Sequence, residues 1–143
     1  MQHIHKWFVI AALIFGVMQF TACQSHHEGH HAEHPAEVEE IPGSNLKKVT
    51  LTEKAIQRID LKTDKVREQQ GKKVVPYSSL IYDPKGETWV YINTGNRSYM
   101  RHKVVVDYID GNLAYLKEGP SVGTVVASVA VAELYGTEFA VGH

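Results

Sequence analysis

The sequence predicts a mainly β fold, a small barrel or sandwich with one short helix near its start, preceded by a disordered tether. Apolar runs of four to eight residues recur along residues 46–143, and turn residues separate them at short intervals. Residues 24–45 instead carry five Glu, no Lys or Arg and few apolar side chains, without periodicity. We therefore expect a leader of residues 1–22, a tether of residues 23–45 and a β-rich domain of residues 46–143.

The leader has the pattern of a secretory signal. A short opening that contains Lys6 precedes the uncharged run Trp7–Phe20, which falls short of the ~20 apolar residues that a membrane-spanning helix needs. The small pair Thr21–Ala22 and then Cys23 follow. "FTAC" resembles the lipobox of bacterial lipoproteins, although Phe20 stands where Leu is usual. The resemblance implies that residues 1–22 are a lipoprotein signal peptide and that Cys23 is the lipidation site.

Cys23 is the only cysteine of the chain, so it has no internal disulfide partner. Lipidation gives this thiol a use and predicts a protein anchored to a membrane in the bacterial envelope and facing the periplasm. The alternative is an incidental or buried thiol that follows a simple cleaved signal or an anchor helix.

Five of the nine histidines lie within nine positions of the tether. They are His26, His27, His30, His31 and His34. On a helical wheel they cover one arc of about 140°. Neutral imidazole is a ligand for Zn, Cu, Ni or Co, so we expect transient binding of a divalent transition metal without an organic cofactor.

Two acidic residues within the cluster, Glu28 and Glu33, are possible additional ligands. The spacing does not match a closed structural zinc site, which needs a fixed Cys/His pattern. The alternative is a polar tether whose histidines bind metal only as an affinity tag does.

The elements of residues 46–143 follow in order. "KKVTL" predicts a short strand, and "TEKAIQRI" predicts a helix with Thr52 as its N-cap. "VVPYSSLIYDPKGETWVYIN" predicts a hairpin whose turn is "DPKG", with Trp89 and Tyr91 on one face of the second strand and Val90 and Ile92 on the other.

The last elements close the domain. "KVVVDYIDGNLAYLKEG" predicts a second hairpin with Asp110–Gly111 at the bend, a favoured two-residue turn. "GTVVASVAVAEL" predicts one more apolar strand, followed by a single helical turn before Gly136.

Three stretches together resemble the membrane-proximal domain of periplasmic adaptors (membrane fusion proteins) of RND-type heavy-metal efflux pumps. They are "VTLTEKAIQRIDLKTDKV", "VVPYSSLIYDPKGETWVYI" and "VVVDYIDGNLAYLKEGPSVGTVVASVAVAELYGTEF". The resemblance covers residues 48–140 and includes the Gly-x-x-x-Gly-x-Val-Val pattern of Gly119, Gly123, Val125 and Val126. It implies an efflux pump or a full-length adaptor as the partner.

The chain also departs from these adaptors. The barrel, lipoyl-like domain and helical hairpin of these adaptors are lacking, because "REQQGKKV" joins the first of the three stretches directly to the second. We therefore expect an accessory to a heavy-metal efflux system, with a stand-alone metal-buffering or structural lipoprotein as the alternative.

Catalysis and nucleic-acid binding are not predicted. No nucleophile elbow surrounds Ser78 or Ser79, and "GPSVGT" lacks the Lys of a phosphate-binding loop. Residues 46–143 carry fourteen Lys and Arg against eleven Asp and Glu, a weak positive field for binding a phosphate backbone. We expect a binding protein and not an enzyme.

Overall fold

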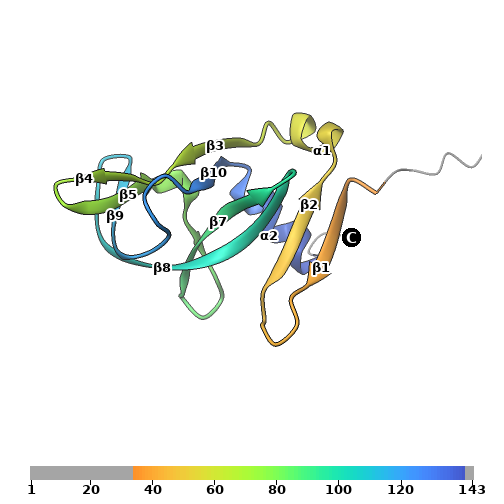
Figure 1. Cartoon of the computed structure of the whole chain (residues 1–143), viewed down its shortest axis with the longest axis horizontal. Helices are drawn as coiled ribbons and strands as arrows, with labels where there is room; N and C mark the ends of the chain where they lie inside the picture. Colours follow the sequence, from red (N-terminus) through yellow and green to blue (C-terminus); the bar gives the residue numbers. More distant parts are fainter. Residues whose placement is uncertain (1–33, 141–143) are drawn as a thin grey trace, which may run out of the picture. The chain divides into compact units, whose positions relative to one another are not determined.

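The alternating apolar residues form strands of one strongly curved sheet in the computed structural model, which describes residues 34–140 (Figure 1). The fold is mainly β, as predicted. The strands are β1 Ala36–Glu40, β2 Lys47–Leu51, β3 Lys62–Lys65, β4 Arg67–Gln69, β5 Lys72–Pro76, β6 Ile81–Tyr82, β7 Thr88–Gly95, β8 Ser98–Asp110, β9 Leu113–Glu118 and β10 Val125–Val129. The helices are α1 Glu53–Arg58, the 3-10 turn Tyr77–Ser79 and α2 Val131–Phe139.

Strand β8 belongs to both halves of the sheet. Its first half pairs with β7 and β2, within the strand order β3-β10-β7-β8-β2-β1. Its second half pairs with β9, which continues to β5 and β4. The register shifts between Val105 and Val106 and again before Tyr108. Such bulges bend a strand, so β8 can turn from one half into the other.

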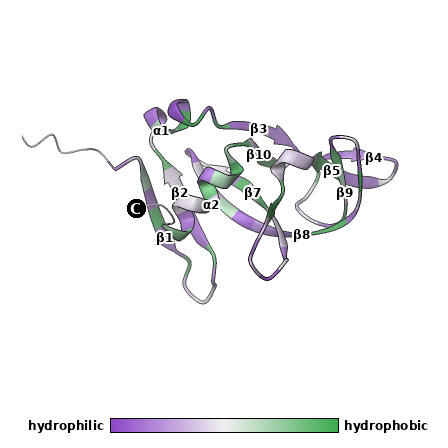
Figure 2. Cartoon of the chain, turned by 180° about the vertical axis from the view of Figure 1, so that it is seen from behind, coloured by the Kyte–Doolittle hydropathy of each residue, from purple (hydrophilic) through white to green (hydrophobic). Residues whose placement is uncertain are grey.

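Two hydrophobic clusters fill this curved sheet. The helix-covered core joins α1 and α2 to one face of the sheet and consists of Val49, Leu51, Ala55, Tyr91, Tyr99, Ala127, Val131 and Leu134. The inter-sheet core joins the two halves and consists of Val66, Val75, Leu80, Val90, Val104, Ala114, Leu116 and Val126. Figure 2 shows hydrophilic residues on β3 and β4, which lie at the edges of the sheet.

Several local predictions are confirmed. Thr52 caps α1 through a hydrogen bond from the Ala55 amide to its hydroxyl, at 3.1 Å. The amide of Gly86 donates to the carbonyl of Asp83 at 2.9 Å, which closes the predicted turn between β6 and β7. Strand β7 presents Tyr91 to the helix-covered core and Val90 to the inter-sheet core.

The predicted boundary of the tether at residue 45 is wrong for residues 36–40. These residues form β1, which pairs with β2 from Ala36 opposite Leu51 to Glu40 opposite Lys47. An edge strand needs only main-chain hydrogen bonds on one side, and charged side chains on it discourage pairing with other chains. Its composition therefore resembles that of a tether. Residues 23–33 of the predicted tether and the leader of residues 1–22 lie outside the described residues.

Two predictions near the end of the domain also need correction. The β8–β9 turn consists of Gly111 and Asn112, one residue later than expected, because Asp110 still pairs with Leu113. The final helical segment is a nine-residue helix, α2, that continues through Gly136 and not a single turn before it. Packing of Leu134 into the helix-covered core stabilises α2 beyond its weak intrinsic propensity.

Candidate functional site

Most of the predicted site residues lie outside the part of the chain that the structure describes. These are Cys23, His26, His27, Glu28, His30, His31 and Glu33. His34 is the first described residue; it is exposed and lines an apolar groove beside β1, β2 and the two helices. Within residues 34–140, no group of three or more His, Cys, Asp or Glu side chains could hold a metal ion.

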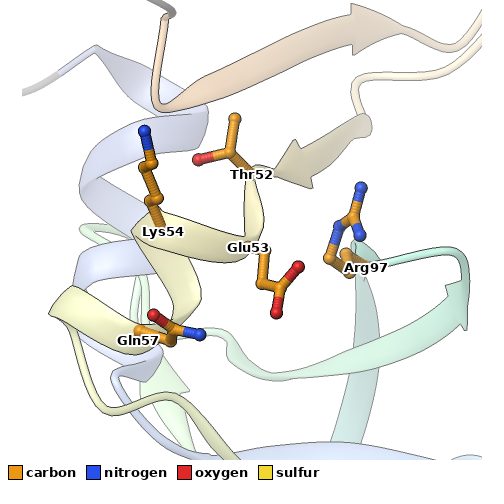
Figure 3. Close-up of a pocket in the computed structure, with 5 residues that line it drawn as sticks. All are labelled: Thr52, Glu53, Lys54, Gln57 and Arg97. Atoms are coloured by element: carbon orange, nitrogen blue, oxygen red, sulfur yellow. The ribbon is translucent and has the colours of Figure 1, made fainter.

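A shallow polar groove lies beside α1. Its lining is Thr52, Glu53, Lys54, Gln57 and Arg97 (Figure 3). In Figure 3, Glu53 extends toward the side of Arg97, whereas Lys54 projects away from it. Arg97 donates from Nε to the carbonyl of Leu51 at 3.2 Å, and Thr52 caps the helix. These groups therefore serve the local fold, and the groove is a weak candidate for a binding site.

A buried ion pair connects β8 to α2. The Nε of Arg101 donates to both carboxylate oxygens of Glu138, at 2.9 and 2.8 Å, and the hydroxyl of Tyr91 donates to Glu138 Oε2 at 2.6 Å. Arg101 is only 6% exposed and Glu138 is 1% exposed. Burial, together with the hydrogen bond to Glu138, raises the pKa of Tyr91 above its ordinary value.

Aromatic rings enclose the guanidinium of Arg101. The ring centroids of Trp89 and Phe139 lie 4.6 and 4.8 Å from its central carbon, and that of Tyr135 lies at 5.9 Å. Contacts of this kind stabilise a desolvated cation through the negative faces of the rings. The guanidinium is therefore held in place by Glu138 at one end and by rings around it.

The loop between β6 and β7 lies next to Arg101 and is organised by one carboxylate. Asp83 Oδ1 accepts hydrogen bonds from the amides of Lys85 and Glu87, and Oδ2 accepts one from Trp89 Nε1. Desolvation acts to raise the pKa of Asp83, but these hydrogen bonds together with the charge of Lys85 outweigh it and lower that pKa. Asp83 thus stays ionised and fixes the indole of Trp89.

Sequence reasoning missed the pair of Arg101 and Glu138. Arg101 occupies an inward position of β8, two residues after the buried Tyr99, and this alternation was the available signal. Its partner lies 37 positions further along the chain in a helix predicted as one turn only. Nothing local therefore indicated which carboxylate would neutralise it.

Among residues 34–140, no helix has the length and apolar character needed to cross a membrane. Comparison of the chain with protein-family models, with curated proteins and with solved structures found no match.

Proposed function

We propose that the protein is a bacterial envelope lipoprotein that binds divalent transition-metal ions and serves as an accessory to a heavy-metal RND efflux system. Cys23 would carry the lipid, and the histidines at positions 26–34 would bind the metal. The single observation that carries this proposal is the cluster of five imidazoles within nine residues. Imidazole ligands release a bound metal ion when they are protonated or when stronger ligands compete, which suits transfer of a metal to a partner.

The start of the folded domain adds support. Only Pro35 separates His34 from β1, so a metal ion bound by the cluster would lie close to this edge strand. Strand β1 carries Glu37, Glu39 and Glu40 with exposed side chains. Lys48 lies 2.6 Å from Glu39 Oε2 and offsets that carboxylate. The other two leave negative charge on the strand that follows His34, and this charge favours cations.

Metal titration tests the binding step. Calorimetry with Zn²⁺, Ni²⁺, Cu²⁺ and Co²⁺ on the detergent-purified protein should detect binding at pH 7.5. Replacement of the five histidines of the cluster by Asn should weaken it at least tenfold, whereas His102→Asn should leave it unchanged. Binding should also weaken below about pH 6, because protons compete for imidazole. Equal metal binding by the five-histidine variant would refute the proposal.

A second experiment tests the partner. A photoreactive residue in place of Lys117, which is exposed on β9, should cross-link a pump subunit or a full-length adaptor in the native envelope. Metal binding without a specific cross-linked partner would favour the alternative, a stand-alone metal-buffering or structural lipoprotein.

Deletion of residues 24–33 separates the role of the histidine-rich segment from that of the domain. It removes four histidines of the cluster and ends before β1, which a longer deletion would disrupt by removing the partner of β2. Under the efflux proposal, cells with this deletion should lose metal tolerance while the cross-link from position 117 persists. Loss of the cross-link as well would mean that residues 24–33, and not the domain, contact the partner.

A further inference from the structure

A cavity of about 400 Å³ lies beside Arg101. None of the residues that line it is a predicted metal ligand. The β1–β2 loop, the β6–β7 loop and the last turn of α2 surround it, and both loops extend toward the lower side of the view in Figure 1. This volume falls within the usual range for small-molecule sites, about 300–1,000 Å³.

Arg101 presents a free edge to this cavity. All hydrogen bonds of its guanidinium to residues 34–140 start from Nε, and both accepting oxygens belong to Glu138. Its two terminal nitrogens are therefore not completely buried within those residues. Arg101 is also one of the residues that line the cavity. A guanidinium that is nine-tenths buried therefore borders the cavity with terminal donors that make no hydrogen bond to residues 34–140.

The carboxylates around the cavity are already engaged. Asp83 accepts two hydrogen bonds from its own loop and one from Trp89 of β7, and Glu87 accepts one from Lys103. Lys85, in contrast, donates only its backbone amide to residues of the described part of the chain. The groups still available to a ligand are therefore mainly donors and positive charges, which favour an acceptor with a negative charge.

The remaining walls of the cavity are flat and apolar. They consist of Leu46, Pro84, Trp89, Tyr135 and Phe139. Aromatic walls favour a flat apolar group, and a planar guanidinium binds a carboxylate through two parallel hydrogen bonds.

We propose that this cavity binds a small carboxylate that carries an aromatic group, with the carboxylate on the terminal nitrogens of Arg101 and the ring against Trp89 and Phe139. A free aromatic acid and the C-terminal aromatic residue of a peptide present the same two groups. The site is independent of the proposed metal binding, because it uses no residue of the histidine cluster.

Fluorescence of Trp89 provides the test. The full chain with Trp7→Phe, purified in detergent, has Trp89 as its sole tryptophan. Phenylacetate should change its emission saturably, with a Kd of roughly 1 mM or lower. Phenylacetamide, which has the same shape without the charge, should bind at least tenfold more weakly. Equal binding of acid and amide, or no saturable change with either, would overturn the proposal.

Two matched arginine variants locate the site. Arg101→Lys keeps the charge beside Glu138 but loses the planar fork, so phenylacetate affinity should fall at least tenfold. Arg97→Lys, in the shallow groove beside α1, should retain the original affinity. If circular dichroism shows that Arg101→Lys is unfolded, Lys85→Ala replaces it and should weaken phenylacetate severalfold. Unchanged affinity in the folded variant would contradict the assignment.

A peptide arm identifies the source of the carboxylate. N-acetyl-Gly-Gly-Phe and its C-terminal amide should differ in the same direction as phenylacetate and phenylacetamide. Tighter binding of the peptide acid than of phenylacetate would assign the site to a protein C-terminus. Tighter binding of phenylacetate would assign it to a free acid.

Discussion

The two cores of the domain are built on different principles. The inter-sheet core contains only Val, Leu and Ala, so any well-shaped apolar set of that volume would serve. Beside the helix-covered core, Arg101 of β8 and Glu138 of α2 form a buried ion pair in which each charge depends on the other. A buried ion pair contributes little net stability while it is intact but is costly to break. The comparison indicates that the inter-sheet core is specified by shape, whereas the helix-covered side of the domain is specified also by charge.

The largest effect should come from breaking the charge match. Arg101→Met leaves the buried carboxylate of Glu138 without its cation and should lower the free energy of unfolding by about 3–5 kcal/mol. Urea denaturation followed by circular dichroism measures this change. The double variant Arg101→Met/Glu138→Gln should recover most of the loss, since no charge stays buried. Point mutants typically lose ~1 kcal/mol of unfolding free energy. A loss of no more than about 1 kcal/mol in Arg101→Met would therefore refute the interdependence of the two charges.

A cavity in the inter-sheet core should come next. Leu116→Ala removes a side chain that is 3% exposed and should cost about 2–5 kcal/mol. Leu113→Ala, on the same strand but only half-buried, is the matched control and should cost less. Equal losses in urea denaturation would show that this core collapses around the missing atoms.

Tyr91→Phe sharpens the comparison with a smaller change. It removes the hydroxyl that donates to Glu138 and should cost about 1–2 kcal/mol near neutral pH.

The same residue also predicts a pH dependence. Because the pKa of Tyr91 is raised in the folded state, its contribution is complete below the unfolded value near 10 and is lost as the pH rises above it. Tyr91→Phe should therefore reduce the alkaline loss of stability, measured by denaturation between pH 9 and 11. An unchanged dependence of stability on pH in this range would mean that other ionisable groups cause the alkaline loss.

The smallest effect belongs to the edge strand, outside both cores. Glu39→Gln removes an ion pair with Lys48 in which the side chain of Glu39 is 66% exposed, and should change stability by no more than about 0.5 kcal/mol. A loss above 1 kcal/mol, beyond the usual range for exposed pairs, would show that this pair holds β1 in place.

Local signals explain the predictions that held. The cap at Thr52, the turn that begins at Asp83 and the alternation around Tyr91 each depend on neighbours within a few residues. The inferences that concern residues 23–33, including the metal ligands, also rest on composition and spacing alone. They remain predictions, because the described structure begins at His34.

Only the tertiary structure decided the remaining features. Residues 36–40 look like a tether by composition, and the main chain of β2 makes them a strand. Arg101 looks like a surface residue until α2 brings Glu138 to it from 37 positions away. A buried charge and an ordered acidic segment both need partners that are remote in the chain. The interactions with these partners stabilise the fold only after the intervening chain has been ordered, which costs entropy.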